Sequence, residues 1–395
     1  MTVKFSERIN NLKASEIREI LKITEQPHVI SFAGGLPAPE LFPVEEMKLV
    51  TQKVLEEEGR QALQYTTTEG FTPLRKIIAQ RMNIKFGTAL NYENILIISG
   101  SQQGLDFSGK ILLNEGDVVL CESPTYLGAI NAFRSYGPRF IEVPTDEKGM
   151  ITEELEKIIN KADRIKMVYV IPDFQNPTGR TWSVERREKF MEIISRYEIP
   201  VIEDNPYGEL RFEGYSPKSL KALDTKGLVI FLGTFSKIFC PGYRIGWVAA
   251  EEEILEKYIL VKQGSDLQSS TIGQREIARY LEMFDLDGHI GEINRVYKAR
   301  RDLAISTMQK EFPGNLSFTR PEGGLFTWVE LPPHVNARGV LVRSLERDVA
   351  FVPGGSFYPN GGHENTLRLN YSNMSEDRLV EGIRRLGSIL DGYTT

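Results

Sequence analysis

The stretch that decides the fold is residues 167–232, where short apolar segments alternate with a helical pattern. Three segments are apolar at almost every consecutive position: MVYVI (167–171), PVIE (200–203) and VIFL (229–232). Strands of this kind are typical of a mostly parallel sheet that is covered on both faces. Between the first two, residues 184–197 have helical spacing with Arg, Glu and Lys at the outer positions. This repetition predicts an α/β domain whose functional loops follow the carboxyl ends of the strands.

Further apolar runs on both sides extend the predicted sheet. They lie at residues 95–98, 118–120, 140–143 and 245–249. We therefore expect a large α/β domain over residues 46–289, in which a mostly parallel mixed sheet is flanked by helices.

The two ends of the chain have a different pattern. A Gly- and Pro-rich stretch, FAGGLPAP (32–39), follows a predicted helix at 15–24, and a long charged helix is expected from about 290 to 311. Strand–turn–strand material follows at 318–331 and 351–371. We expect residues 1–45 and 290–395 to form a smaller α+β domain together.

Composition excludes several classes of protein. The 395 residues are 41% hydrophobic and 26% charged, which is typical of a folded globular chain. A net charge of −6 without a basic run argues against nucleic-acid binding. Two cysteines and four scattered histidines offer no disulfide framework and no metal site. The apolar runs are far shorter than a membrane helix, and the first residues lack a signal-peptide core, so we expect a cytoplasmic protein without a membrane partner.

The segment GTFSKIFCPGYR (233–244) follows the strand at 229–232 and carries the strongest chemical signal. Lys237 could act as a covalent amine nucleophile. Thr234, Ser236 and Arg244 could hold a phosphate group, because Arg244 offers a planar fork and the hydroxyls are neutral donors. The alternative is a solvated lysine beside a structural turn.

Two further strand ends carry polar residues. Asp204, after the strand at 200–203, would need a cationic partner if buried, and a protonated pyridine nitrogen would be one. The alternative is an Asx-type turn at 204–206. Asn176, in QNPTG (175–179), follows the strand at 167–171 and could donate to a phenolate oxygen, or could belong to a plain β-turn.

The segment SGSQQGL (99–105) stands between a strand and a helix. Its small residues at a helix N-terminus, with Ser101 and Gln102, could bind an anion, or Ser101 could simply cap the helix. It matches neither a dinucleotide fingerprint nor a Walker loop. Tyr126, on a loop after another strand, could stack on a flat heteroaromatic ring or could be a core tyrosine. Together these groups suit one site, and neither a nicotinamide site nor a nucleotide site needs that set.

With these motifs the chain resembles the fold-type I, class I aminotransferases, which depend on pyridoxal 5′-phosphate (PLP). The resemblance covers almost the whole length and depends on QNPTG (175–179), EDNPY (203–207) and TFSK (234–237) together with Arg244. The stretches ISFAGGLPAPELFP (30–43) and ALQY (62–65) are similar to the branch that contains 2-aminoadipate, aromatic amino acid and kynurenine aminotransferases.

The resemblance implies a role for each matching residue around PLP. Lys237 would form the internal aldimine and move the proton between the substrate Cα and the cofactor. Asp204 would pair with the pyridinium nitrogen, Asn176 and Tyr207 would bond the ring O3′, and Tyr126 would stack on the ring. The phosphate would be held by Ser101, Gln102, Thr234, Ser236 and Arg244.

It also implies a homodimer with its active sites at the interface, because Tyr65 matches a tyrosine that reaches the phosphate of the neighbouring subunit. Arg368 would bind the substrate α-carboxylate with help from Asn176, although without the resemblance it would suggest a surface arginine on a strand. Gly35 would allow close approach of the substrate. Arg18 would contact the side chain of the substrate, or would be an exposed helix arginine.

The implied reaction moves an amino group from an amino acid to a 2-oxo acid, plausibly 2-oxoglutarate, by ping-pong kinetics. We expect broad use of aromatic amino acids, 2-aminoadipate or both. One alternative keeps PLP and acts as a β-lyase on cysteine conjugates. Another is a ligand-sensing regulator with an aminotransferase-like domain, which would need a winged-helix module ahead of the large domain.

Overall fold

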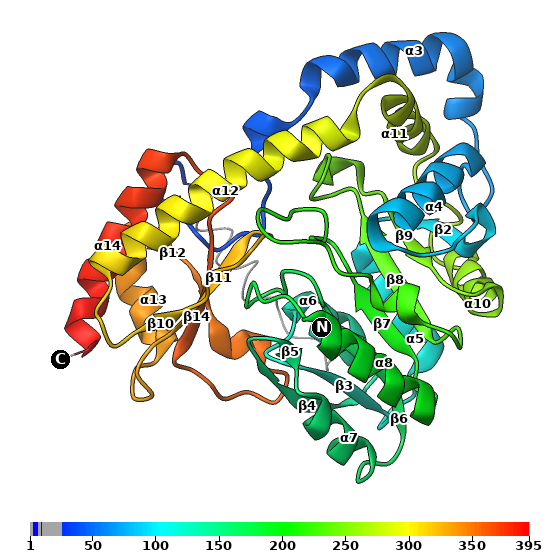
Figure 1. The fold of residues 1–395 in the computed structure, drawn as a ribbon. Coiled ribbons are helices and arrows are strands. Elements are labelled where there is room, and N and C mark those ends of the chain that lie inside the picture. The colour runs from blue at the N-terminus through cyan, green and yellow to red at the C-terminus, as the bar shows by residue number, and fades with distance from the viewer. Residues whose placement is uncertain (1–2, 7–8, 10–25, 395) are drawn as a thin grey trace.

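The computed structural model describes residues 3–6, 9 and 26–394. Its centre is a sheet of eight strands in the order β2-β9-β8-β7-β6-β3-β4-β5 (Figure 1). The strands are β2 (Ile95–Ile98), β3 (Val118–Ser123), β4 (Arg139–Asp146), β5 (Gly149–Met150), β6 (Ile165–Val170), β7 (Val201–Asp204), β8 (Val229–Thr234) and β9 (Gly246–Ala249).

Most strands of this sheet run in one direction. The pairs β4-β3, β3-β6, β6-β7 and β7-β8 are parallel. β9 is antiparallel to both β8 and β2, so β2 runs with the parallel set, and the short β5 is antiparallel to β4. Every residue of β2, β7 and β8 is buried, which explains the consecutive apolar residues in the sequence. The predicted α/β fold with a mostly parallel mixed sheet is confirmed.

Helices connect and cover these strands. Ser183 caps α8 by accepting a hydrogen bond from the Arg186 N–H, and the helix covers the predicted residues 184–197. At α5 the N-cap is Gly100, so the alternative in which Ser101 caps that helix is wrong. The helices of this part are α3 (Val44–Ala62), α4 (Thr72–Phe86), α5 (Ser101–Leu112), α6 (Leu127–Arg134), α7 (Thr152–Ile159), α8 (Val184–Tyr197), α9 (Leu220–Leu223), α10 (Glu252–Gln263) and α11 (Thr271–Met283).

The C-terminal part contains a second, antiparallel sheet in the order β10-β11-β14-β13. A separate pair, β1 with β12, joins the N-terminal segment to this part of the molecule. The strands are β1 (Ile30–Ser31), β10 (Ser317–Phe318), β11 (Phe326–Glu330), β12 (Val349–Ala350), β13 (Val352–Pro353) and β14 (Thr366–Asn370), with helices α13 (Ala337–Leu345) and α14 (Glu376–Thr394).

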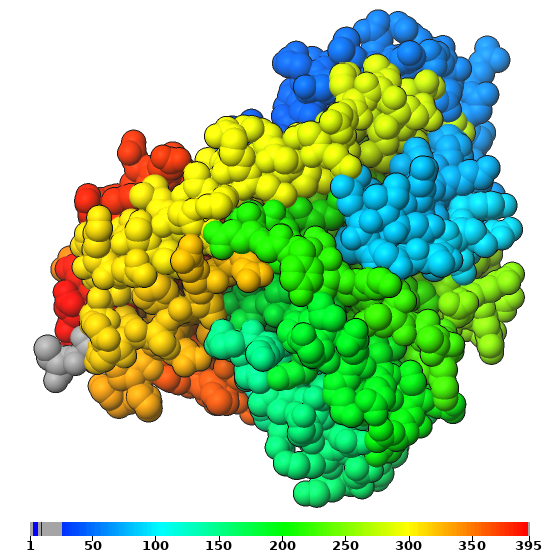
Figure 2. Space-filling view, in the orientation of Figure 1, coloured from blue at the N-terminus to red at the C-terminus, as the bar shows by residue number. Residues whose placement is uncertain are grey.

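The long helix α12 (Leu286–Glu311) links the two parts, and it begins a few residues before the expected position. Its first turns pack in the core beneath the large sheet, through Ile290 and Ile293, whereas Ala304 and Met308 pack in the core of the C-terminal part. On the surface it forms a ridge between the C-terminal elements and the region of α3 and α11 (Figures 1 and 2). The domain division at residues 46–289 stays a prediction.

The segment that follows β1 runs from the two-stranded pair of β1 and β12 toward the eight-stranded sheet. Its backbone is held by β14 and the residues that follow it, since the Asn370 N–H donates to the Phe32 carbonyl and the Ser372 hydroxyl donates to the Leu36 carbonyl. This attachment brings residues 32–36 over the carboxyl edge of the parallel strands. Among the described residues, every helix is too short or too polar to span a lipid bilayer.

Candidate active site

A cavity of about 340 Å³ lies at the carboxyl edge of the large sheet. It stands where β2, β3, β6, β7 and β8 end and where β9 begins, so it is built by loops that are far apart in the sequence. All the predicted site residues except Tyr65 and Arg18 line it: Gly35, Ser101, Gln102, Tyr126, Asn176, Asp204, Tyr207, Thr234, Ser236, Lys237, Arg244 and Arg368.

Lys237 extends from the loop after β8, and its ammonium group donates a hydrogen bond of 2.8 Å to the Gly35 carbonyl oxygen. Burial lowers the pKa of this amine to about 8, with the positive charges of Arg244 and Arg368 acting in the same direction. A larger share of the amine is therefore neutral near pH 7 to 8 than for an ordinary lysine. The alternative of a solvated lysine at a strand end is wrong for this residue.

Asp204 is the last residue of β7 and is 2% exposed. Its Oδ2 accepts a hydrogen bond of 2.9 Å from the Tyr169 hydroxyl, while its Oδ1 has no hydrogen-bond partner among the described residues. Burial raises the pKa of the carboxyl group to about 7, although the Tyr169 hydrogen bond opposes this. The turn that follows is held by Asn205, whose Oδ1 accepts from the Gly208 N–H, and not by Asp204.

Arg368, on β14, forms the opposite wall of the cavity. Its guanidinium donates from Nη1 to Asn176 Oδ1 at 2.7 Å and from Nη2 to the Ala33 carbonyl at 2.6 Å. It lies over the rings of Phe326 and Phe357, at 4.2 and 5.1 Å from their centroids. At 2% exposure it is not a surface arginine, and burial lowers its pKa to about 10. No carboxylate is hydrogen-bonded to it among the described residues, so it is suited to an anionic ligand.

Asn176 and Tyr207 join this wall to the loop after β7. The Asn176 amide donates to the Tyr207 hydroxyl at 3.4 Å, and the Tyr207 ring meets Phe326 edge-on. Both side chains are buried, so their polar ends are directed by these contacts rather than by solvent.

Small polar groups gather at the other end of the cavity. The Thr234 hydroxyl donates to Ser236 Oγ at 2.9 Å, and Arg244 Nη1 reaches the same oxygen at 3.4 Å. Gly100 comes so close to Arg244 that a Cβ there would lie 2.3 Å from Nη2, and its φ of +79° also favours glycine. Ser101 and Gln102 form the first turn of α5, whose free N–H groups and positive helix end favour an anion.

Tyr126 precedes α6 and is the N-cap residue of that helix. Its ring lies against the backbone of Gly128, where a Cβ would come within 2.4 Å of the ring. Gln102 Nε2 donates to the Gly128 carbonyl at 3.1 Å and so connects this loop to α5. The ring is therefore held at the cavity wall and is only partly buried.

Two predicted site residues lie elsewhere. Tyr65 is 78% exposed and lines a separate surface pocket between the end of α3 and the start of α11. Its contribution to a neighbouring subunit stays a prediction. Arg18 lies outside the described residues, as does the predicted helix at 15–24.

Sequence reasoning missed two residues that support the cavity. Tyr169 stands within an apolar strand pattern, although a tyrosine at a buried strand end needs a partner for its hydroxyl. Glu122, at the end of β3, accepts hydrogen bonds from the Ile171 N–H and from the Trp182 indole, both at 2.9 Å. These two donors stand at either end of the loop that carries Asn176, so Glu122 holds that loop against β3.

These residues fit a phosphorylated pyridine aldehyde. The Asp204 Oδ1 without a partner suits a protonated ring nitrogen, and the space at Gly100 that a side chain would fill lies beside the hydroxyl and guanidinium donors. Lys237 lines the same cavity and supplies an amine. Such a constellation of amine, carboxylate and anion site is typical of a PLP enzyme.

Comparison with known proteins gives the class. The chain matches the family "Aminotransferase class I and II" over residues 27–386 and belongs to it. It is an aminotransferase that acts on amino acids, and membership of this family implies a PLP-type cofactor.

Three relatives make the similarity concrete. The aromatic-amino-acid aminotransferase 1 of Thermococcus litoralis is 44% identical over 390 residues, which are 98% of this chain and 94% of the relative. The structure of kynurenine aminotransferase from Pyrococcus horikoshii, in complex with PMP, is 42% identical with a TM-score of 0.95, covering 99% of this chain and 98% of that one. LysN, the α-aminoadipate aminotransferase of Thermus thermophilus, complexed with N-(5′-phosphopyridoxyl)-L-leucine, is 41% identical with a TM-score of 0.92 over 98% and 97% of the two chains.

Proposed function

We propose that this aminotransferase binds PLP in the cavity between Lys237 and Asp204 and uses aromatic amino acids, 2-aminoadipate or both as amino donors. The proposal depends on one observation, the placement of a lysine amine, a carboxylate with an unpartnered oxygen and an arginine–asparagine pair around a single cavity. The donor classes come from the relatives, whose printed names describe enzymes for aromatic amino acids, kynurenine and α-aminoadipate. The proposed acceptor is 2-oxoglutarate.

Each residue has a separate task in this proposal. Asp204 would hold the ring nitrogen as a cation, Asn176 and Tyr207 would hold the ring oxygen, and Tyr126 would stack on the ring. The phosphate would be bound by Ser101, Gln102, Thr234, Ser236 and Arg244. When bound, the cofactor supplies an electron sink for the pair of electrons left after the substrate Cα proton is removed.

Substrate binding and proton transfer fall to two further residues. Arg368 binds the α-carboxylate through its guanidinium fork, and its contact with Asn176 Oδ1 fixes the direction of that fork. Lys237 Nζ would hold the cofactor, and the same amine would take the substrate Cα proton and give it back. An amine with a pKa of about 8 is suited to this work, because it accepts a proton near neutral pH and gives it back.

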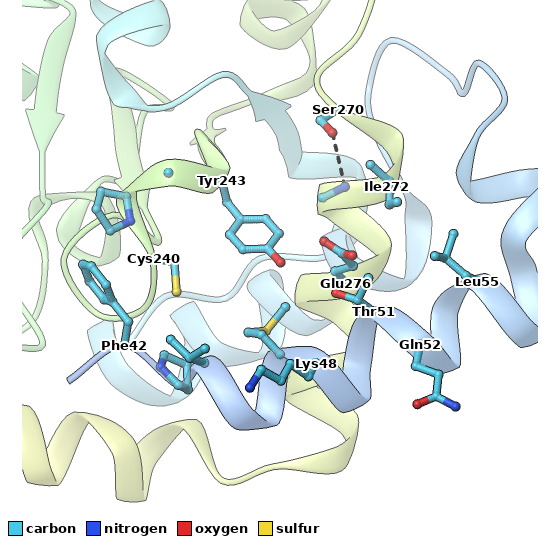
Figure 3. A pocket seen from close by; sticks show the side chains of 16 residues that line it. Phe42, Lys48, Thr51, Gln52, Leu55, Cys240, Tyr243, Ser270, Ile272 and Glu276 are labelled. Atoms are coloured by element: carbon cyan, nitrogen blue, oxygen red, sulfur yellow. Dashed lines mark hydrogen bonds between the residues drawn. The ribbon is translucent and has the colours of Figure 1, made fainter. Parts of the chain in front are cut away.

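We also propose that two copies of the chain form a dimer across a groove beside the active site. The groove encloses about 940 Å³ between α3, α11 and the loop at 240–243, and Figure 3 shows the Tyr243 hydroxyl directed toward Glu276 within it. Val44 and Leu55 are 56% and 44% exposed there, and such apolar surface favours a protein partner. Because Pro241 lines both the groove and the active-site cavity, a second copy seated here would adjoin the phosphate-binding residues.

The exposed Tyr65 supports this arrangement. It lies just beyond α3 and does not line the cavity of its own chain. In the proposed dimer it reaches the phosphate of the neighbouring subunit, which makes the site incomplete in a single chain.

The test is a pair of half-reactions with the PLP-loaded enzyme. Phenylalanine, tyrosine, kynurenine, 2-aminoadipate and glutamate are each added without an acceptor, and the absorbance of the bound cofactor is followed. We expect rapid loss of absorbance with aromatic donors or 2-aminoadipate, and its return with 2-oxoglutarate. No change with any of these donors would contradict the proposed donor classes.

An S-substituted cysteine serves as the control for the β-lyase alternative. A β-lyase would release pyruvate repeatedly without any 2-oxo acid acceptor. We expect at most one equivalent of cofactor to react under those conditions.

A further inference from the structure

The hydroxyl group of Tyr169 is the one hydrogen-bond donor that reaches the Asp204 carboxylate among the described residues. The two residues lie on neighbouring parallel strands, β6 and β7, in which Tyr169 is paired with Ile202. Asp204 is two residues further along β7 and therefore on the same face of the sheet. In this register the hydroxyl lies 2.9 Å from Oδ2.

The tyrosine has little freedom to move. It is 1% exposed, and its ring meets the ring of Phe133 edge-on, with centroids 5.7 Å apart and planes at 75°. Burial, and then the charge of Asp204, raise its pKa well above the ordinary value. The hydroxyl thus stays protonated at physiological pH and can only donate to the carboxylate.

This contact divides the two carboxylate oxygens between two tasks. Oδ2 accepts the hydrogen bond from the tyrosine. Oδ1 has no hydrogen-bond partner among the described residues, and Asp204 lines the cavity. A carboxylate that can rotate freely would offer either oxygen, whereas one held at Oδ2 offers a fixed direction at Oδ1.

We propose that Tyr169 is a positioning residue that keeps Asp204 ionised and directs its Oδ1 toward the cationic ring nitrogen of the cofactor. The inference rests on the proposed function, since it concerns the same site. Tyr169 acts through Asp204 and does not line the cavity.

The energetic direction follows from the hydrogen bond. A donor to the charged form stabilises the carboxylate and lowers its pKa, so it opposes the effect of burial on Asp204. Without this hydroxyl the buried carboxyl would take up a proton at a higher pH and could no longer neutralise a cation.

Other ionisable groups lie around this pair. Tyr126 and Glu122, from the β3 side, contribute to the raised pKa of Tyr169, and Tyr207, on the loop after β7, is affected by the charge of Asp204. Lys237 lines the same cavity as Asp204. All four remain in a Tyr169→Phe variant, so a difference from the wild type isolates the hydroxyl.

The experiment measures the dissociation constant of PLP between pH 5.5 and 8.5 for the wild type and for Tyr169→Phe, with activity and thermal unfolding of the cofactor-free protein as accompanying readouts. Tyr258→Phe is the matched control, because Tyr258 is also fully buried and its hydroxyl bonds Ser108 away from the cavity.

We expect PLP to bind about tenfold more weakly to Tyr169→Phe near pH 7, as for loss of a hydrogen bond to a charged group. The acid limb of PLP binding should move to higher pH by about half a unit or more, because the carboxyl is harder to ionise. Tyr258→Phe should lower the unfolding temperature without moving this limb. An acid limb at the wild-type pH in Tyr169→Phe would overturn the inference.

A double variant shows whether the tyrosine acts through Asp204. In an Asp204→Asn background, Tyr169→Phe should change PLP affinity by less than about twofold, since the charge that it supports is gone. A full tenfold loss in that background would also overturn the inference. If the wild type itself neither bound PLP nor transaminated, the proposed function would fail, whereas normal wild-type behaviour with an unaltered Tyr169→Phe enzyme rejects this inference alone.

Discussion

Two hollows lie on either side of the loop at 240–243, and they differ in nearly every respect. The active-site cavity is the smaller, at about 340 Å³, and is lined by a lysine, an aspartate and two arginines from distant parts of the chain. The groove between α3 and α11 encloses about 940 Å³ and has apolar side chains such as Val44 and Leu55 on its walls. Size alone would select the groove as the ligand site.

The side chains that line the two hollows favour the smaller cavity as the ligand site instead. Convergent charged groups with shifted pKa values, including Lys237 and Asp204, are found in the smaller cavity. An exposed apolar surface is more typical of a protein interface. In the proposed function the two hollows have different roles: the groove would receive a second chain, and the cavity would receive the cofactor and the substrates.

The largest expected loss of activity comes from replacing Lys237 in the cavity. Lys237→Ala removes the amine that we propose takes the Cα proton, so turnover should fall by at least about 1000-fold. PLP should remain bound without a covalent link, because the phosphate donors and Asp204 are unchanged. Steady-state rates and borohydride reduction followed by mass spectrometry measure the two effects.

Lys226→Ala is the control for this variant, since Lys226 is an exposed lysine paired with Glu198. It should leave both the rate and the borohydride label unchanged. Near-normal turnover in Lys237→Ala would show that the cavity is not the catalytic site, and would contradict the distinction between a catalytic cavity and an apolar groove.

The next effect concerns the substrate carboxylate. Arg368→Lys keeps a positive charge and loses the guanidinium fork, so kcat/KM for the amino acid should fall by about 100-fold. The fall should come mainly from KM, whereas PLP affinity should change little.

Arg301→Lys is a matched control because Arg301 is also fully buried and bonds the Pro321 carbonyl, and neither residue lines the cavity. It should reduce the unfolding temperature and leave KM unchanged. Equal losses of kcat/KM in the two variants would mean that Arg368 acts only on stability.

The sequence could predict the parts of this molecule that depend on local pattern. The run at 229–232 is apolar throughout because β8 is buried on both faces, and Ser183 marks the start of α8 by capping it. The residues after each parallel strand could be assigned to one site because parallel strands end at the same edge.

The parts that depend on distant contacts could not be predicted in the same way. The residues near Arg368 do not indicate that it will be buried against Asn176, because 192 positions separate the two; only the family resemblance paired them. The partner of Tyr169 depends on the register between β6 and β7, and register is a property of the assembled sheet. Likewise the groove arises only when α3 packs beside α11.

The groove is tested by a charge placed on its apolar wall. Leu55→Glu should produce a monomer, because a carboxylate buried in an interface without a partner is costly. Light scattering after size-exclusion chromatography measures the mass. PLP affinity should fall by about tenfold in the same variant, since Tyr65 of the second copy would no longer reach the phosphate.

Val342→Glu is the matched control, since Val342 is 61% exposed on α13 in the C-terminal part. It should remain a dimer with normal PLP affinity. A dimeric Leu55→Glu protein would show that the groove is not the interface and would break the proposed division between the two hollows.

The smallest expected effect concerns Glu122, which supports the cavity, and it is a change in how stability depends on pH. Burial raises the pKa of Glu122 from 4.5 to about 7, although its hydrogen bonds with Ile171 and Trp182 act against this. A group that binds its proton more tightly in the folded state makes folding less favourable as the pH rises from about 4.5 to 7. Glu122→Gln lacks this titration, so the stability advantage of the wild type over the variant should shrink across that range.

Unfolding temperatures at pH 5 and pH 7.5 measure the change, which should be about 2 °C or more. Glu203→Gln is the matched control: burial also raises the pKa of Glu203 to about 7, and its carboxylate accepts from the backbone of Leu220 and Lys221 at α9, away from the cavity. Both variants should show the same trend with pH, and only Glu122→Gln should also weaken PLP binding, because Glu122 holds the loop of Asn176. If PLP affinity fell equally in both, the frame of the cavity would depend on buried charge in general and not on the contacts of Glu122.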